Sequence, residues 1–395
     1  MSTQLVDSLR IEKETVWVRP CSAFGSRYLA DDFWVAYDAS VDLEQGTEAV
    51  ALMPFALAIV TAAWASGDTW VVPELDAVQA EALLTARAAL RGWYTRIPWD
   101  GELEAERTTT ALAGAGGPDV ILFSGGVDST YSALSEAPGA VLLLVRGIDI
   151  ALDNGPGWAR VRREAQALAE RAGHTLVTAE TSLRRHLRRD VADNLHREGR
   201  NWWGSVQHGL ALAGLGIPVA ASRGGSRVLV PATLWPDAAE PLGSLPELDE
   251  SGRWSSGEVV HHGFEVSRHG KLRWLVERSD EIGPIFLRVC YSIPHGAGGN
   301  CLSCEKCLRT ALALMLEGRD PLPFGLPIPP REVERRLHAG VEKRVFESIA
   351  PAQPMWAELA ARAVEHPGLT SAAFRDWFLP DMGGFFEDRP LLRAA

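Results

Sequence analysis

The chain has 395 residues and a mass of 42.9 kDa, which at about 150 residues per domain predicts two or three domains. Hydrophobic residues make up 46% of it and charged residues 23%, as in globular proteins with a sizeable core. The net charge of −12 argues against a protein whose whole surface binds nucleic acid. Five cysteines, mostly clustered near position 300, do not suit the disulfide scaffold of a small secreted protein.

No segment is predicted to span a membrane. The longest apolar stretch, residues 49–66, contains a proline and lacks flanking positive charge, so a buried helix or a pair of strands is expected there. The first residues do not show the charged, then apolar, then small-residue pattern of a signal peptide. Together with the grouped thiols, this predicts a cytoplasmic protein.

Residues 1–113 predict an N-terminal α+β domain. Alternating patterns at 15–18 and 33–37 are typical of strands. Residues 75–94, rich in alanine, leucine and arginine, predict a helix. The small residues at 113–118 then predict a linker and a domain boundary.

From residue 119 onwards, apolar strands alternate with helical stretches. Strands are expected at 119–123, 140–145, 174–178 and 227–231, and helices at 129–136, 158–172 and 206–213. This alternation predicts an α/β fold with a parallel sheet, in a second domain over residues 114–325. Within it, the polar stretch 236–258 is expected to be a loop. Helical spacing after residue 329 predicts a C-terminal helical extension over 326–395.

The clearest chemical signal is the hexapeptide Ser124–Gly125–Gly126–Val127–Asp128–Ser129, between a predicted strand and a predicted helix. Backbone N–H groups converge on an anion at such a helix N-terminus, and glycines let the backbone approach phosphate oxygens. No lysine follows to grip a γ-phosphate. A carboxylate beside phosphates implies a bridging Mg²⁺ or a helix cap, and a plain capped strand-to-helix turn is the alternative. The candidate nucleotide-binding residues are Ser124, Gly125, Gly126, Val127, Asp128, Ser129 and Thr130.

A second signal is a cluster of cysteines with metal-ligand spacing. Cys290, Cys301, Cys304 and Cys307 supply four soft ligands, the last three in two CxxC steps. Such a set can enclose one tetrahedral zinc ion with no open position, and it therefore predicts a structural site. An iron–sulfur cluster and metal-free or redox-active thiols are the alternatives. Cys21 is expected to be an ordinary buried thiol.

The hexapeptide resembles the SGGxDS loop of the PP-loop ATP pyrophosphatases, the adenine nucleotide α-hydrolase-like group. The resemblance implies that ATP is split between its α- and β-phosphates, that the loop holds the departing pyrophosphate, and that AMP passes to the substrate. With the four cysteines and Arg309 behind it, the chain is more specifically similar to the 7-cyano-7-deazaguanine synthases, whose cysteines bind zinc. Tyr291, next to Cys290, belongs to the same matching stretch. Weaker matches are residues 199–201 with the helix behind them, and Lys271, which resembles a lysine upstream of the cysteines.

The resemblance covers about residues 118–317 and departs from the family in two places. Residues 146–154 replace the family's Gly-Gln-Arg-His-type segment, and the stretch between residues 230 and 271 also differs. Because these parts shape the acceptor pocket, the resemblance implies the ATP chemistry without naming the acceptor. It says nothing of the two flanking regions.

Four further groups of residues have both a functional and a structural explanation. The basic run at 184–189 could meet tRNA or a polyphosphate, but in an acidic chain a solvated helix face is expected. The adjacent histidines at 261–262 cannot share one face of a helix or strand, so loop histidines are expected rather than a metal site. The tryptophans at 202–203 could stack on a ring beside Arg200, and core packing is the prediction for them. Arg268 and the lysine three residues later either neutralise phosphate charge or lie on the surface.

The combined prediction is an AMP-forming ligase that uses ATP and Mg²⁺ and carries structural Zn²⁺. An oxygen of a small-molecule carboxylate or amide would attack the α-phosphate, and ammonia or an amine would then displace AMP. Positioning and charge stabilisation, not a covalent residue, would supply the rate. The candidate catalytic residues are Asp128, Lys271 and Arg268.

Three alternatives are open. Sulfur transfer to a nucleobase would need catalytic cysteines, and only Cys21 lies outside the cluster. A nucleotide-binding subunit that regulates or scaffolds a partner is a non-enzymatic explanation. Modification of a protein terminus is the third. A protein partner or a homo-oligomer is compatible with these hypotheses, whereas no membrane partner is expected and nucleic acid is disfavoured.

Overall fold

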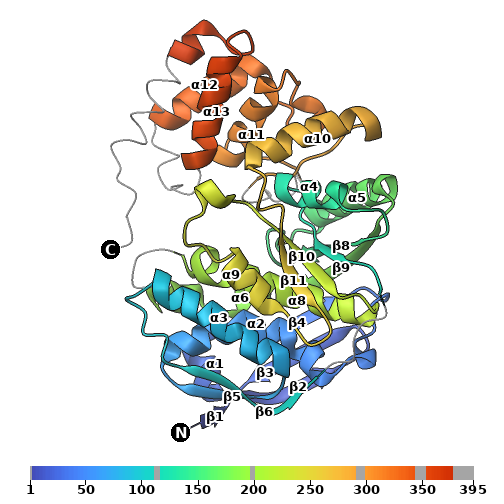
Figure 1. The fold of residues 1–395 in the computed structure, drawn as a ribbon, viewed down its shortest axis with the longest axis vertical. Helices are drawn as coiled ribbons and strands as arrows, with labels where there is room; N and C mark the ends of the chain where they lie inside the picture. The colour runs from blue at the N-terminus through green and yellow to red at the C-terminus, as the bar shows by residue number, and fades with distance from the viewer. Residues whose placement is uncertain (1, 111–115, 196–200, 291–298, 343–352, 377–395) are drawn as a thin grey trace.

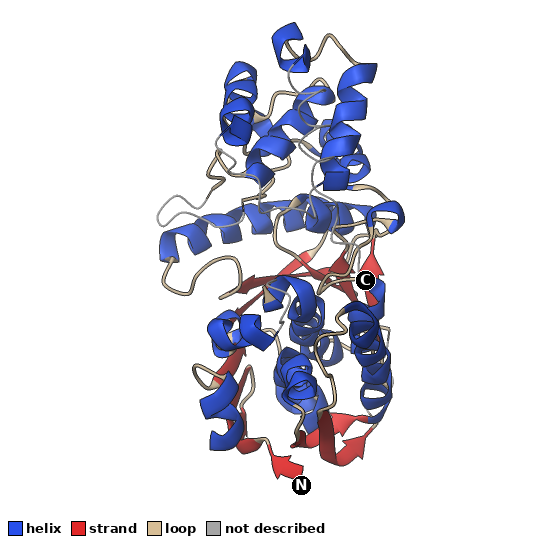
Figure 2. Cartoon of the chain, turned by 90° about the vertical axis from the view of Figure 1, so that its left-hand side faces the viewer, coloured by secondary structure: helices blue, strands red, loops and turns tan. Residues whose placement is uncertain are grey.

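The computed structural model describes residues 2–110, 116–195, 201–290, 299–342 and 353–376 (Figure 1). Over these residues the protein is a mixed α/β structure. Helices from the C-terminal part of the chain form one end of the long axis, and strands from the N-terminal part lie at the other end (Figure 2). A large sheet with helices on both faces extends from the end with the N-terminal strands towards the helical end.

Five parallel strands form the half of the main sheet that carries the candidate site. They are β7 (Val120–Leu122), β8 (Val141–Arg146), β9 (Thr175–Thr181), β10 (Arg227–Pro231) and β11 (Glu258–His262). Their order across the sheet is β11-β10-β7-β8-β9, and each neighbouring pair is parallel. The structure thus confirms the predicted α/β class and its parallel sheet, and it adds β11 to the strands expected from the sequence.

Strands from the first part of the chain continue the same sheet. β4 (Phe33–Tyr37) pairs antiparallel with β9, and β3 (Thr15–Pro20) and β2 (Val6–Ile11) follow it as antiparallel neighbours. The main sheet therefore has eight strands and crosses the boundary predicted near residue 113. That residues 1–113 fold as a domain of their own stays a prediction, and residues 113–115 of the predicted linker lie outside the described part of the chain.

A buried helix joins the main sheet to a smaller one. The smaller sheet is parallel and consists of β1 (Ser2–Gln4), β5 (Thr69–Asp76) and β6 (Glu102–Thr109). Helix α2 (Glu48–Ser66) packs against β5 and β6 and also against α8 (His208–Ser222), which covers β7 and β10. Since α2 is enclosed on every side, it is apolar on every side. This confirms the expectation of a buried element at 49–66.

The close contact between α2 and α8 depends on a glycine. A Cβ at Gly214 of α8 would lie 3.0 Å from the carbonyl oxygen of Met53 and 3.2 Å from the Cβ of Leu57. By length and composition α2 could cross a membrane, but 94% of its most apolar window is buried inside the protein. Core helices of globular proteins have this property.

Successive residues of a strand point to opposite sides of the main sheet, and helices cover both sides. Side chains are therefore buried on both faces. On β7, Val120 and Leu122 belong to the core that contains α2 and α8, whereas Ile121 belongs to a second core. Among the helices that contribute to that second core are α4 (Val127–Ser135), α5 (Gly155–Ala172), α10 (Arg268–Ile282) and α11 (Glu305–Leu316). Helices α4 and α8 therefore cover opposite faces of β7.

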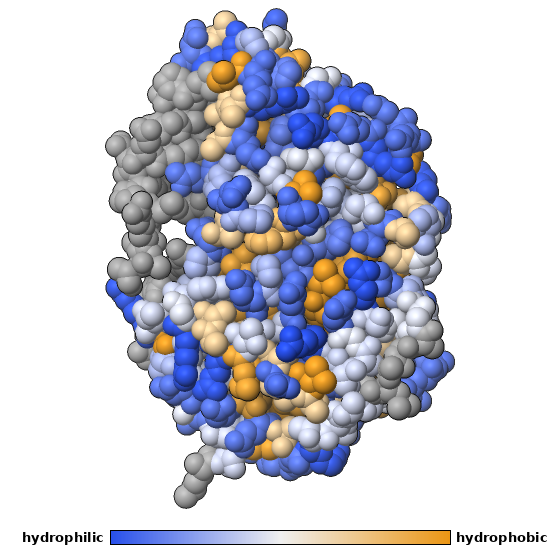
Figure 3. Space-filling model, in the orientation of Figure 1, coloured by the Kyte–Doolittle hydropathy of each residue, from blue (hydrophilic) through white to orange (hydrophobic). Residues whose placement is uncertain are grey.

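The helical end of the molecule is formed around α11. Helices α12 (Pro330–Glu342) and α13 (Gln353–Glu365) pack against it, which confirms helices after residue 329. Glu317, directly after α11, accepts hydrogen bonds from Arg362 of α13 and pairs with His269 of α10 at 2.7 Å. Burial alone would raise the pKa of Glu317, but these two partners outweigh it and lower the pKa. On the face shown in Figure 3, hydrophilic residues predominate over this end.

The remaining elements are short or peripheral. They are α1 (Ser22–Tyr28), α3 (Ala77–Trp93), α6 (Leu183–His186), α7 (Arg189–Leu195), α9 (Pro246–Asp249), a π-helical turn at Trp203–Gln207, and 3₁₀ turns at Leu43–Gln45, Pro236–Ala238, Glu250–Gly252 and Leu322–Phe324. Helix α3 confirms the helix expected at 75–94. The stretch 236–258 is not wholly a loop as expected, because Pro236 and Pro246 each start a short helical turn.

His186 makes the stability of the fold depend on pH. Its ring packs against both Phe33 and Phe55, and its Nδ1 lies 2.8 Å from the carbonyl oxygen of Asp31. A carbonyl can only accept, so Nδ1 carries a proton; because burial disfavours the charged form, the imidazole is neutral with Nε2 unprotonated. Burial lowers the pKa of His186 from 6.5 to about 4. Protonation therefore favours the unfolded chain, and the stability held above pH 6.5 is lost as the pH falls towards 4.

We expect that lowering the pH from 7 to 5 reduces the free energy of unfolding by about 2 kcal/mol through the protonation of His186. In His186→Gln that contribution should disappear, whatever the absolute stability of the variant. The measurement is urea unfolding of both proteins at the two pH values. The same pH dependence in both would contradict the assignment to His186.

Candidate functional site

The candidate residues gather at one edge of the main sheet. Because β7 to β11 are parallel, the segments that follow them all leave from the same edge. The chain runs from β7 to β8 and β9 on one side and then returns to the other side of β7 to form β10. The crevice at such a reversal is where open α/β sheets bind ligands. The predicted phosphate loop directly follows β7 and lies at this reversal.

The loop Ser124–Ser129 turns from β7 into α4. Gly125 has a φ of +76°, in the left-handed region that residues with a Cβ disfavour. Within the described residues no side chain caps the N-terminus of α4. Its first N–H groups therefore point out of the helix together with the positive end of the helix dipole. The hydroxyl oxygens of Ser124 and Ser129 lie 3.2 Å apart beside these N–H groups.

Two residues of the loop face the interior instead. Val127 is 1% exposed and lies in the core, so it can offer only its N–H. Thr130 is fully buried, and its N–H donates to the carbonyl oxygen of Gly126 at 2.9 Å. The hydroxyl of Thr130 is shielded from solvent and has no hydrogen-bond partner among the described residues. Thr130 therefore presents no donor at the surface of this structure, and its role as a phosphate contact stays a prediction.

Two of the three predicted catalytic residues contact each other directly. Arg268, the first residue of α10, donates to Oδ2 of Asp128, and the hydroxyl of Thr233 donates to the same oxygen at 3.2 Å. Both charged side chains are largely buried, so each compensates the charge of the other. Oδ1 of Asp128 is buried without a partner among the described residues. Asp128 thus joins α4, α10 and the end of β10, and it does not cap α4.

Lys271, one turn further along α10, is fully buried. Its Nζ donates to the carbonyl oxygen of Ala232 at 2.6 Å and lies 5.9 Å from the ring centroid of Tyr131. Burial lowers the pKa of Lys271, and the charge of Asp128 opposes this shift. Lys271 therefore lies near the Asp128–Arg268 pair but is engaged within the protein. Its catalytic role stays a prediction.

Arg288 is a residue of the loop's surroundings that the sequence analysis did not identify. Its N–H donates to the carbonyl oxygen of Gly125, and its Nε donates to that of Ser124, both at 2.7 Å. Its Nη2 donates to Asp149, in the segment after β8, at 3.1 Å. Burial alone would raise the pKa of Asp149, but the charge and hydrogen bond of Arg288 lower it overall. The one signal in the sequence is that Arg288 stands two residues before Cys290.

Lys306 brings a further positive charge towards the loop. It lies in the first turn of α11, and its charge interacts with those of Arg268, Asp149 and Asp128. Burial, and next the repulsion from Arg268, lowers the pKa of Lys306 to about 8. The site thus contains two carboxylates, Asp128 and Asp149, and three cations. The cations are Arg268, Arg288 and Lys306, and they lie at the edge where phosphate groups would add negative charge.

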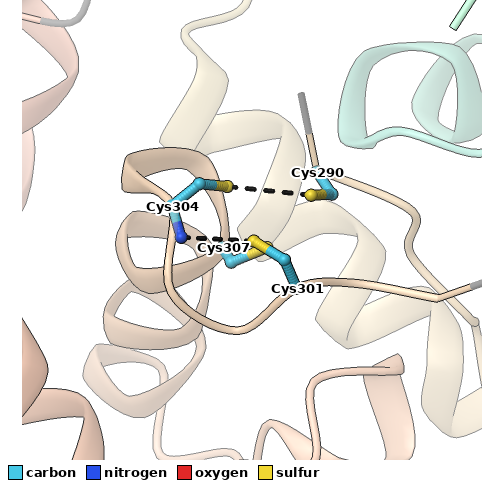
Figure 4. Close-up of side chains that lie close together, drawn as sticks. All are labelled: Cys290, Cys301, Cys304 and Cys307. Atoms are coloured by element: carbon cyan, nitrogen blue, oxygen red, sulfur yellow. Dashed lines mark hydrogen bonds between the residues drawn. The ribbon is translucent and has the colours of Figure 1, made fainter. Parts of the chain in front are cut away.

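The four clustered cysteines come together in space (Figure 4). All their Sγ atoms lie within 4.8 Å of one another, with 3.8 Å between Cys301 and Cys307 and 3.9 Å between Cys304 and Cys290. Tetrahedral Zn–S bonds of about 2.3 Å place the sulfurs about 3.8 Å apart, so the cluster fits a single metal ion such as zinc. A multi-iron cluster, with its own sulfides between the ligands, needs more room. None of the five cysteines, all of them described, forms a disulfide.

Two local features hold the cysteines in place. Cys304 precedes α11, and its N–H points at Sγ of Cys301 at 3.3 Å, as Figure 4 shows. On the Cys290 side of the cluster, Oδ1 of Asn300 accepts hydrogen bonds from the N–H groups of residues 289–290 at 2.9 and 3.2 Å. Nδ2 of Asn300 donates to the carbonyl oxygen of Leu287 at 2.8 Å. The ligands are thus positioned by backbone groups and by one amide side chain.

The two tryptophans have different surroundings. Trp202 is buried and stacks on Trp99, with centroids 5.9 Å apart, which confirms core packing for it. Trp203 is half-buried, with the guanidinium of Arg184 4.5 Å from its ring centroid and His208 against its edge. Gly199 and Arg200 of the weaker match, and Tyr291 beside the first cysteine, lie outside the described residues.

The histidines at 261–262 are not in a loop, contrary to expectation. They end β11 and, as neighbours on a strand, face opposite sides of the sheet. Nδ1 of His261 lies 2.6 Å from Asp249, whereas His262 contacts Ser132 and Glu136 of the α4 region at 2.9 Å. Because their partners are separate, the two imidazoles do not form a joint metal site.

We expect the purified chain to bind about one zinc ion, and Cys304→Ser to lose most of it and to melt several degrees lower. The matched control is Cys21→Ser, because Cys21 is a buried thiol far from the cluster in sequence and should leave the metal content unchanged. Elemental analysis and thermal melting check both. A Cys304→Ser protein that kept its zinc would contradict the four-ligand site.

No protein-family model, no curated protein and no solved structure matches this chain. The likeness of the hexapeptide and the cysteines to the PP-loop group therefore stays a prediction from the sequence. The function has to be argued from the geometry of the site.

Proposed function

We propose that the protein is an ATP-dependent, AMP-forming ligase whose loop at 124–129 holds the β- and γ-phosphates of ATP. The observation that carries this proposal is the position of the loop. An uncapped helix N-terminus, preceded by two glycines, stands where the order of the parallel strands reverses. The cations Arg268, Arg288 and Lys306 support a ligand of high negative charge.

In the proposed reaction an oxygen of a substrate carboxylate or amide attacks the α-phosphorus of ATP. The bond from that phosphorus to the bridging oxygen breaks, and pyrophosphate leaves with the electron pair. Ammonia or an amine then attacks the adenylate and AMP leaves. The loop N–H groups and the nearby cations stabilise the charge on pyrophosphate, so positioning and electrostatics supply the rate.

Mg²⁺ would be held jointly by the phosphates and by Asp128. The fit rests on Oδ1 of Asp128, which has no partner among the described residues, since Mg²⁺ in nucleotide sites takes one or two carboxylates plus phosphate oxygens. When bound, the ion supplies charge neutralisation. Arg268 and Thr233 keep the carboxylate oriented through its other oxygen.

The acceptor substrate would bind further along the same edge. A hollow there is lined by Arg184, Asn201 and Trp203 among other residues, and it lies beside the segment that follows β9. His208 packs edge-on against Trp203 of this hollow, with ring centroids 5.3 Å apart, and its charge interacts with that of Asp149 near the loop. A lining of cationic and aromatic groups favours a planar acid as acceptor.

Asp128→Asn should lower the formation of AMP and pyrophosphate from ATP by about 100-fold or more, because it removes the carboxylate that would hold Mg²⁺ beside the phosphates and that pairs with Arg268. Ser135→Ala, at the far end of α4, is the matched control and should keep activity. The measurement is exchange of labelled pyrophosphate into ATP with a panel of aromatic carboxylates, with circular dichroism to verify the fold.

Formation of ADP and phosphate instead of AMP and pyrophosphate would rule out this chemistry. Binding of ATP without either reaction, over the whole panel, would favour the alternative of a nucleotide-binding subunit.

A further inference from the structure

The cysteine cluster and the phosphate loop are joined by one short segment of chain. Arg288 lies two residues before the metal ligand Cys290 and makes two hydrogen bonds to carbonyl oxygens of the loop, at Gly125 and Ser124. Between Arg288 and the cluster, Asn300 binds the N–H groups of Val289 and Cys290. The backbone is therefore held without interruption from the loop to the first sulfur.

The guanidinium of Arg288 also reaches a second loop. Its Nη2 donates to Asp149, which follows β8, while its Nε donates to the loop after β7. Arg288 itself is 6% exposed, whereas the side chain of Asp149 is half exposed, so the guanidinium is held from the buried side of this contact. A planar fork can make both contacts at fixed angles, whereas a lysine has a single donor centre. Arg288 thus fixes the position of two segments at the reversal of strand order.

We propose that Arg288 is a positioning residue that couples metal binding at the four cysteines to phosphate binding at residues 124–129. The inference rests on the proposed function, because it takes the loop to be the phosphate site. A metal ion ties Cys290 to the three sulfurs near the start of α11. Without the ion, that tie is lost, the segment before Cys290 has more freedom, and the loop loses the brace that keeps its N–H groups aligned.

Coupling of this kind is reciprocal. If the metal strengthens phosphate binding by some factor, a bound phosphate ligand must strengthen metal binding by the same factor. The test uses inorganic pyrophosphate as the probe and the full chain with and without zinc. Calorimetry measures the affinity for pyrophosphate, and chelator competition measures the affinity for zinc. We expect both affinities to change by about 10-fold, within the usual range of such couplings.

Substitutions of Arg288 in the zinc-loaded protein test whether this residue carries the coupling. Arg288→Gln and Arg288→Lys should both bind pyrophosphate about 10-fold more weakly and reduce the coupling to below about 2-fold. The matched control is Arg336→Gln. Arg336 donates to the carbonyl oxygen of Leu302, inside the cysteine cluster, from α12 and has no recorded contact with the described residues of the loop. It should leave the coupling factor unchanged, even if zinc affinity falls.

The outcomes separate this inference from the proposed function. Pyrophosphate binding of equal strength with and without zinc would overturn the coupling and leave the phosphate site intact. No binding of pyrophosphate or ATP in either form would refute the proposed function. Full coupling in Arg288→Gln would show that another residue carries it. Should removal of zinc unfold the chain, the loaded variants decide, since normal pyrophosphate affinity in Arg288→Gln would overturn the inference.

Discussion

The parallel pairing of β7 to β11 determines where the residues of the candidate site lie more than any single contact does. Every strand from β7 to β11 has to end at the same edge, so whatever follows one strand is brought beside whatever follows its neighbours. Ser124 and Arg288 are 164 positions apart and share a hydrogen bond, and Asp128 and Arg268 meet across 140 positions. The reversal of strand order at β7 places one of these segments, the uncapped start of α4, at the position where open α/β sheets bind ligands.

Features with local causes could be predicted from the sequence. The turn from β7 into α4 has its own glycines, the helix at 77–93 has its own periodicity, and the cysteine cluster has its own spacing. Contacts made across the chain could not be predicted in this way. The alternating pattern of β4 predicts a strand but not that its partner is β9. Two adjacent histidines end β11, and polar residues of this kind are not expected at the end of a buried strand. Their hydrogen-bond partners lie on other segments of the chain, so the sequence does not show how the imidazoles are accommodated.

The surroundings of the loop contain more positive than negative charge. Asp128 and Asp149 each contact an arginine, and Lys306 adds a third cation beside them. Desolvation penalises unbalanced charge, as the lowered pKa of Lys306 shows. An anion at the start of α4 would restore the balance. The electrostatics and the strand order therefore point to the same kind of ligand at the same place.

The wholly apolar surface of α2 has a consequence for biosynthesis. Its main partner, α8, follows it by about 140 residues. At about 5–20 residues per second, the ribosome needs on the order of 10 s to make that stretch. Until then the nascent chain can cover α2 with β5 and β6 of the smaller sheet, but the apolar face that packs against α8 has no native partner. The production of this protein in cells is thus expected to depend on chaperones that shield the segment until α8 emerges.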